Sequence, residues 1–250
     1  MNLLLSGIKS LLPWRVRNVI RGGHRQLVFR RAMRRFLKQI ETSAQPASSL
    51  VNDLVYGWGN ESWSAQEGYL AGCIEHALLA KRPILECGSG LSTILIGAIA
   101  KSRGIEHWAL EHSPEWAARV QKHLDEYKID SVVLCTKPLR DYGDFSWYDP
   151  PLVSMPESFS LVLCDGPPGS TRGGRFGLVP VMRSRLGPGC IILIDDASRK
   201  EELAIAKCWQ VDLGATLETI VCAEPYIKLT VTVQQRIDSA KEAGSYAAGF

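Results

Sequence analysis

Seven short apolar runs between residues 84 and 233 constrain the fold of this chain more than any other feature. Most are almost continuously apolar, which is typical of strands buried on both faces of a parallel sheet. Helical patterns separate the earlier runs, as in the segment 114–127, where Trp116, Val120 and Leu124 share a helix face. The alternation predicts an α/β fold with helices on both faces of the sheet. The runs are ILEC (84–87), HWALE (107–111), SVVLC (131–135), LVLCD (161–165), CIILID (190–195), ETIVC (218–222) and IKLTVTV (227–233).

The last two runs are connected differently from the others. Only the segment 223–226 separates them, which is too short for a crossover helix but suits a hairpin. The sequence therefore predicts a seven-stranded, mostly parallel sheet whose last strand is antiparallel. We place this core at residues 81–236 and expect residues 237–250 to form a flexible tail.

The first 42 residues form a basic, amphipathic segment. The first forty contain ten Lys or Arg and no Asp or Glu, so the rest of the chain carries a net charge of −7 against +3 for the whole. Pro13 and the pair Gly22–Gly23 are expected to divide this N-terminal helical extension into two or three pieces. One interpretation is an arm that contacts anionic lipid. The other is an arm packed on the domain or on a second subunit of a homo-oligomer; no nucleic acid partner is expected.

Residues 43–80 are expected to hold a linker, a lid and a leading helix. The segment TSAQPASS, 42–49, is typical of a linker, and the aromatic and glycine-rich segment 56–63 suits a flexible cover over a ligand, or a turn packed on the sheet edge. Ser64 and Glu67 have the spacing of a capping box, which predicts a helix start there.

Cysteine usage and hydropathy predict a cytoplasmic protein. The seven cysteines have no CxxC spacing and lie mostly within apolar runs, which indicates buried, reduced thiols. No window reaches the roughly 18 consecutive apolar residues of a membrane span. Residues 1–12 lack both the charged region and the cleavage site of a secretory signal. Peripheral membrane contact through residues 1–42 is the one membrane association that we consider.

The segment from Glu86 to Ser92 carries the first chemical signal. Glycines at positions 88 and 90 would let the backbone approach a ligand and supply positive φ, and Ser92 and Thr93 can cap the following helix. A dinucleotide site is disfavoured, because Thr93 replaces the third glycine of that fingerprint and Glu86 would repel a pyrophosphate. Glu111, about twenty residues beyond the loop, can accept both hydroxyls of a ribose. A nucleoside with a positive charge and no phosphate satisfies these features.

The sequence ECGSGLST followed by LEH resembles the cofactor region of the class I S-adenosylmethionine-dependent methyltransferases. The resemblance implies a Rossmann-like fold and covers roughly residues 55–234. It implies that the Gly-rich loop holds the methionine part of the cofactor, that Glu111 holds the ribose, and that His112 lies near the adenine. The expected cofactor-binding residues are Glu86, Gly88, Ser89, Gly90, Ser92, Glu111 and His112.

Three carboxylates follow the fourth and fifth core strands. Asp165 ends one run, and Asp195 and Asp196 end the next. Carboxylates that converge on one cleft repel each other unless a cation or proton lies among them, and Mg²⁺ is the divalent ion most suited to oxygen ligands. The pattern resembles the metal-dependent O-methyltransferases, and the Asp-Asp form is closer to their sugar-modifying branch. This predicts a divalent metal bound by Asp165, Asp195 and Asp196. The alternative is that Asp195 or Asp196 caps the next helix.

The function that we predict is methyl transfer to a hydroxyl of a saccharide or another small molecule. The expected catalytic residues are Asp165, Asp195 and Arg175, although Arg175 could simply pair with the acids. Pro168 stands where catechol-type enzymes have a lysine, so the general base remains open among Lys200, His112 and the aspartates. His24, His76, His107 and His123 are interpreted as structural or surface residues. The alternatives are a metal-free methyltransferase with an Asp base, a nicotinamide-dependent oxidoreductase, and a non-catalytic scaffold that docks through its basic arm.

Overall fold

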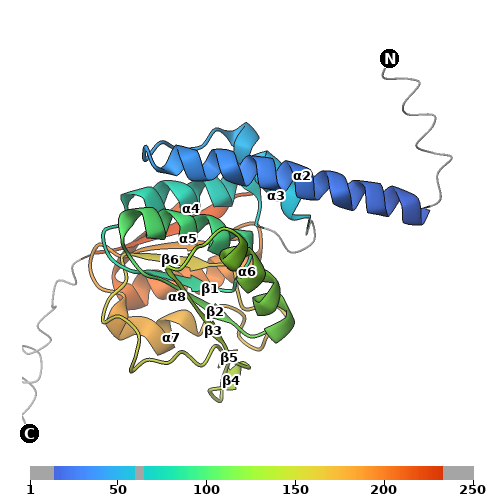
Figure 1. Ribbon diagram of the computed structural model, residues 1–250. Helices are drawn as coiled ribbons and strands as arrows, with labels where there is room; N and C mark the ends of the chain where they lie inside the picture. The colour runs from blue at the N-terminus through green and yellow to red at the C-terminus, as the bar shows by residue number, and fades with distance from the viewer. Residues whose placement is uncertain (1–13, 60–64, 233–250) are drawn as a thin grey trace, which may run out of the picture.

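A computed structural model describes residues 14–59 and 65–232 of the 250-residue chain. Seven strands form one sheet in the order β3-β2-β1-β6-β7-β9-β8 (Figure 1). β9 pairs antiparallel with both β7 and β8, and the remaining pairs are parallel. The prediction of a mostly parallel sheet with an antiparallel last strand is therefore confirmed. The strands are β1 (Ile84–Cys87), β2 (His107–Glu111), β3 (Val132–Thr136), β6 (Leu161–Cys164), β7 (Ile191–Ile194), β8 (Ala215–Ile220) and β9 (Tyr226–Val231).

Helices cover both faces of this sheet because successive side chains of each buried strand point to opposite sides. Ile84 and Leu161 belong to one hydrophobic cluster, with α4 (Glu67–Leu79), α5 (Leu91–Arg103) and α6 (Pro114–Glu126). Leu85 and Val162, one residue further along each strand, belong to the other cluster, with α7 (Leu178–Met182) and α8 (Lys200–Leu213). The 3-10 turn Arg183–Arg185 follows α7, and a separate ribbon of β4 (Arg140–Asp141) and β5 (Ser146–Trp147) lies in the long connection after β3.

The N-terminal extension consists of α2 (Trp14–Ile40) and α3 (Ser48–Trp58). α2 is continuous across Gly22 and Gly23, so the predicted break there is wrong. Glycine lowers helix propensity by about 1 kcal/mol but keeps its N–H, so it does not remove a helical hydrogen bond as proline does. Pro13, the other predicted break, lies outside the described residues.

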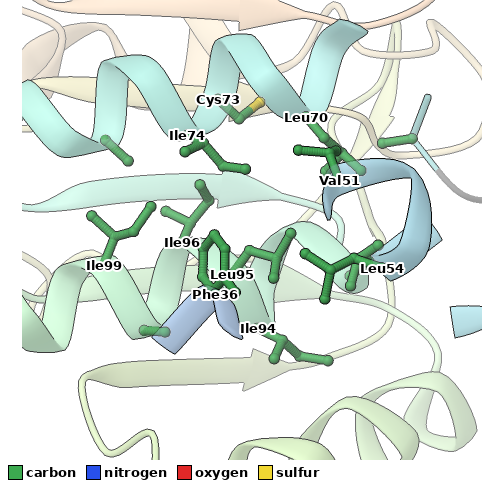
Figure 2. Close-up of a cluster of buried hydrophobic side chains, with 14 of the residues drawn as sticks. Phe36, Val51, Leu54, Leu70, Cys73, Ile74, Ile94, Leu95, Ile96 and Ile99 are labelled. Carbon is green, nitrogen blue, oxygen red and sulfur yellow. The ribbon is translucent and has the colours of Figure 1, made fainter. Parts of the chain in front are cut away.

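The C-terminal half of α2 is part of the main hydrophobic core. Phe36 of α2 belongs to the same hydrophobic cluster as Leu54 of α3, Leu70 and Ile74 of α4, and Leu95 of α5 (Figure 2). This half is buried on the domain, as one of the two interpretations of the arm proposed. The predicted linker at 42–49 is shorter than expected, because α3 already begins at Ser48.

The capping box predicted at Ser64 is wrong. α4 begins at Glu67, with Gln66 as its N-cap residue and no side-chain cap. Glu67 is therefore the first residue of the helix rather than the third. Ser64 itself, and residues 60–63 of the predicted cover, lie outside the described residues.

All seven cysteines have free thiols, and Cys73, Cys87, Cys164 and Cys190 are buried. Within residues 14–59 and 65–232, no helix combines the length and the apolar character needed to cross a bilayer.

Candidate active site

A cavity of about 740 Å³ lies at the carboxyl ends of β1, β2, β6 and β7. Its volume falls within the range of about 300–1,000 Å³ that small-molecule sites occupy. The strand order reverses between β1 and β6, and ligands of such sheets bind where this reversal opens a crevice. Lys200, one of the candidates for the general base, does not line this cavity. All the residues predicted to bind the cofactor or a metal, or to act in catalysis, do line it: Glu86, Gly88, Ser89, Gly90, Ser92, Glu111, His112, Asp165, Arg175, Asp195 and Asp196.

The Gly-rich loop leads from β1 into α5. Gly88 has a φ of +98°, which favours glycine, whereas Gly90 is extended with a φ of 172°. The prediction that both glycines supply positive φ therefore holds only for Gly88. No atom lies within 4 Å of the point where a Cβ at Gly90 would be, so this position leaves cavity space open. Thr93 caps α5 as expected, because its Oγ1 accepts a hydrogen bond of 2.8 Å from the Gly90 N–H.

Glu86, at the end of β1, is buried and held from two sides. The Ser92 hydroxyl donates to its Oε1 at 2.5 Å, and the His107 Nε2 lies 3.0 Å from its Oε2. Ser92 therefore orients the carboxylate instead of capping α5. His107 is buried on the neighbouring strand β2. It was interpreted as a structural or surface residue, and in the structure it is a buried residue that contacts Glu86 of the site. Strand register creates the contact, so no local sequence signal indicates it.

Glu111, at the end of β2, has both carboxylate oxygens engaged. Oε1 accepts backbone N–H groups of His112 and Ser113 at 2.7 and 2.8 Å, and the His112 Nδ1 lies 3.1 Å from it. Oε2 accepts a hydrogen bond of 2.7 Å from the Ser89 hydroxyl of the Gly-rich loop. These bonds orient the carboxylate at the cavity wall and connect the first two strand ends.

Two tryptophans also line this cavity: Trp58, from the segment 56–63 that was predicted as a cover or an edge turn, and Trp116, which the sequence analysis did not assign to the site. Trp58 ends α3 and Trp116 lies in the first turn of α6, and their rings meet edge to face at 5.9 Å. The Arg119 guanidinium lies over both rings, at 4.4 and 4.9 Å, and donates to the Trp58 carbonyl at 2.7 Å. Trp116 also donates its Nε1–H to the Ser89 carbonyl at 2.5 Å. The N-terminal extension thereby contributes a wall of the site. The sequence did contain one signal for Trp116: it follows the Glu111 strand end by only five residues, which places it near the carboxyl edge of the sheet.

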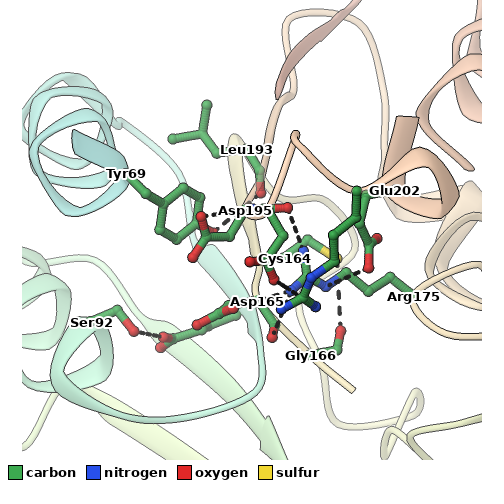
Figure 3. A network of polar contacts seen from close by, with 12 residues as sticks. Tyr69, Ser92, Cys164, Asp165, Gly166, Arg175, Leu193, Asp195 and Glu202 are labelled. Carbon is green, nitrogen blue, oxygen red and sulfur yellow. Dashed lines mark hydrogen bonds and ion pairs between the residues drawn. The ribbon is translucent and has the colours of Figure 1, made fainter. Parts of the chain in front are cut away.

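Arg175 lies among the carboxylates that follow β6 and β7 (Figure 3). Its side chain is only 2% exposed. The Nη2 atom lies 3.2 Å from Asp165 Oδ1 and 2.8 Å from Asp196 Oδ2, and Nε lies 3.7 Å from Glu202 Oε1. It also donates to the backbone carbonyls of Asp195 and Asp165, at 2.6 and 3.2 Å. One guanidinium therefore provides the counter-charge for this cluster.

This arrangement does not fit the predicted divalent metal. The three aspartates line one cavity, as predicted, but the positive charge among them belongs to Arg175, and a nearby divalent ion would be repelled by it. No group of three or more His, Cys, Asp or Glu residues within the described ranges is arranged to hold a metal ion. The assignment of Asp165, Asp195 and Asp196 as metal ligands is therefore unsupported.

The alternative role of the aspartates as helix caps is also wrong. α8 begins at Lys200, its N-cap residue is Arg199, and this end has no side-chain cap. Asp195 instead accepts the Asp196 N–H at 2.8 Å, and Asp196 pairs with Arg199 at 2.9 Å.

The surroundings of Asp195 and Asp165 raise the pKa of both carboxyl groups. Burial raises the pKa of Asp195 to about 6, although the hydrogen bond from the Asp196 N–H lowers it. Burial also raises the pKa of Asp165 well above its ordinary value, the negative charge of Asp195 raises it further, and Arg175 opposes the shift. A carboxyl group with a pKa near 6 can exchange protons close to neutral pH.

No protein-family model and no curated protein matches the sequence. Solved structures do match the fold. The S-adenosylhomocysteine-bound Podospora anserina methyltransferase PaMTH1 is 15% identical, with a TM-score of 0.52 over 70% of this chain and 82% of that one. The Geobacter metallireducens precorrin-6y C5,15-methyltransferase is 15% identical, with a TM-score of 0.50 over 68% and 90% of the two chains. A human methyltransferase 10 domain containing protein is 13% identical, with a TM-score of 0.50 over 74% and 97%.

These likenesses concern the arrangement of the backbone, since the identities are low. The mostly parallel sheet with its reversed last strand is consistent with them. The chain therefore has the fold of the class I S-adenosylmethionine-dependent methyltransferases.

Proposed function

We propose that this protein transfers a methyl group from S-adenosylmethionine to a hydroxyl of a saccharide or a similar polar small molecule, without a divalent metal. The observation that carries the proposal is the placement of Glu86, Glu111 and the Gly-rich loop on one cavity with Asp195. Two carboxylates at neighbouring strand ends suit a ligand that combines a positive charge with a ribose.

The chain offers three features to such a cofactor. Gly90 leaves open space beside the loop, and the acids at positions 86 and 111 are oriented by hydrogen bonds before a ligand arrives. Each hydrogen bond to a charged carboxylate contributes about 1.5–3 kcal/mol, and an oriented group loses less entropy on binding. The cofactor, when bound, supplies an electrophilic methyl group. Trp58 and Trp116 provide apolar walls that limit water on that side of the cavity.

Asp195 is the base that we propose for the acceptor. An aliphatic hydroxyl is a weak nucleophile at neutral pH, so removal of its proton at the transition state accelerates attack. The Asp195 carboxylate would accept this proton, and its raised pKa brings its basicity close to neutral pH. Arg175 holds the surrounding carboxylates in place and balances their charge. Arg199 and Asp196, on the same cavity, can hydrogen-bond a polyhydroxylated acceptor.

Calorimetric titration with S-adenosylhomocysteine tests the cofactor assignment. Glu111→Ala is expected to weaken binding by about 1.5–3 kcal/mol, because a buried charged acceptor is lost. Glu115→Ala, an exposed acid in the first turn of α6, is the matched control and should bind like the wild type. No heat of binding in a folded, cofactor-free sample would refute the methyltransferase proposal and favour a non-catalytic scaffold.

A chelator separates the metal-free mechanism from a metal-assisted one. Once an acceptor is found by methyl transfer to saccharide and polyol libraries, activity should not change after dialysis against EDTA. If EDTA abolished activity and Mg²⁺ restored it, the proposal that Arg175 supplies the positive charge in place of a metal ion would be contradicted.

A further inference from the structure

The two halves of α2 have different surroundings. Phe29, Met33, Phe36 and Ile40 are buried in the core, whereas the N-terminal half of the helix extends beyond the rest of the molecule (Figure 1). Packing against the domain therefore accounts for the second half of α2 only.

The protruding half carries an apolar stripe on its outer side. Val16, Val19, Ile20 and Leu27 follow the spacing i, i+3, i+4 and i+11, so they share one face. Their exposures are 42, 76, 57 and 69%. Phe29 starts the buried face thirteen residues after Val16, and thirteen residues rotate an α-helix by about 220°. We call these four residues the outer stripe; they point away from the core.

Basic residues continue the same face toward the C-terminal end of α2. Arg31, Arg34 and Lys38 follow Leu27 by four, seven and eleven positions and are exposed. α2 contains no Asp or Glu. Arg30 pairs with Glu126 of α6 and Arg35 with Asp53 of α3, but no ion pair engages Arg31, Arg34 or Lys38 among the described residues. One side of α2 is thus apolar over residues 16–27 and cationic over residues 31–38.

We propose that this side of α2 docks on an anionic lipid surface. Amphipathic helices lie in the plane of a bilayer with their apolar side chains below the headgroups, and exposed basic residues are attracted to anionic lipid. A second copy of the helix is a poorer partner, because a parallel pair would bring cations together with no acid on either helix, and an antiparallel pair over residues 16–27 would leave the basic part without an anionic partner. The docking surface is separate from the cavity and does not depend on the proposed function.

Flotation of the full-length protein with vesicles tests the proposal. The wild type should bind vesicles of phosphatidylcholine and phosphatidylserine and leave phosphatidylcholine vesicles unbound, with binding that weakens as salt is added. Val19→Glu should reduce binding by at least about tenfold, because a charge in the outer stripe cannot enter the apolar layer. Val211→Glu on α8 is the control: Val211 is 80% exposed, close to the 76% of Val19, and this variant should bind like the wild type.

The cationic part is tested by Arg31→Ala combined with Arg34→Ala, which should lose the preference for phosphatidylserine. Three outcomes would overturn the proposal. One is equal binding of Val19→Glu and Val211→Glu. Another is a wild-type dimer in sedimentation velocity that Val19→Glu dissociates, without vesicle binding. The third is retention of duplex DNA or RNA by a protein that ignores vesicles.

Discussion

The buried guanidinium of Arg175 faces carboxylates from three segments of the chain: the end of β6, the end of β7 and the first turn of α8. Asp165 and Asp196 raised the expectation of a divalent cation because their convergence requires positive charge. An arginine meets the same requirement and in addition fits planar carboxylates with directed N–H groups. The acids indicated that a positive charge lies between them, but not that Arg175 supplies it.

Arg175→Met should lower the free energy of unfolding by roughly 3 kcal/mol at neutral pH, because it leaves the buried Glu202 and the partly buried Asp165 and Asp196 without their partner. Urea unfolding measures the change. Arg172→Met is the control, since Arg172 pairs with Asp141 on the exposed surface and its loss should leave the midpoint unchanged. Equal effects of the two variants would contradict the buried ion cluster.

Asp195 makes stability depend on pH in a defined direction. Its pKa of about 6 in the folded state lies above the ordinary value near 3.9, so the folded protein binds this proton more tightly than the unfolded chain. Stability from this group is therefore complete below about pH 4 and falls as the pH rises to about 6, by roughly 3 kcal/mol. Asp195→Asn should lack this component in urea unfolding from pH 4 to pH 7.5. Parallel profiles of the two proteins would show that Asp195 does not titrate there.

Among the elements, α2 and α3 are in close contact at Gly57. A Cβ at this position would lie 2.7–2.8 Å from backbone and Cβ atoms of Phe29. Gly57→Ala should therefore destabilise the protein by about 1–3 kcal/mol, since the two helices must separate.

Gly22→Ala provides the opposite expectation within the same extension. Nothing lies within 4 Å of a Cβ at Gly22, so alanine should stabilise α2 by about 0.5–1 kcal/mol through its helix propensity. The melting temperatures of Gly57→Ala and Gly22→Ala compare the effect of a steric clash between helices with the effect of helix propensity. A loss of stability in both would indicate that the surroundings of Gly22 are also packed.

At the scale of the whole molecule, the N-terminal extension is divided between core and surface. Removal of residues 1–27 should leave the melting temperature nearly unchanged, because Phe29, Met33, Phe36 and Ile40 stay in place. Removal of residues 1–42 should lower it strongly, since each large apolar side chain lost from the core costs about 2–5 kcal/mol. Calorimetry of both truncations, with gel filtration to detect aggregation, makes the comparison. Equal melting temperatures would mean that α2 contributes no core.

The local pattern of the chain determined the strands, most helices, the Gly-rich loop and the acids at the strand ends. Each of the seven apolar runs overlaps a strand, although β8 begins at Ala215, three residues before the run 218–222, and the acids at positions 86, 111, 165 and 195 reach one cavity. This was predictable because parallel strands carry whatever follows them to the same edge of a sheet. The errors fall at helix boundaries, where the local signals are weak: α2 continues through Gly22 and Gly23, and α4 begins at Glu67.

Only the tertiary structure decided which groups these residues meet. His107 reaches Glu86 through strand register, Trp58 reaches the cavity because α3 packs on the core, and Arg175 takes the place proposed for a metal. Such contacts join residues distant in sequence, and their energy depends on burial and geometry that no short sequence window contains. The pattern of strands and helices in the sequence can therefore locate the cavity. Which side chains contact each other inside it depends on how the sheet and the helices pack.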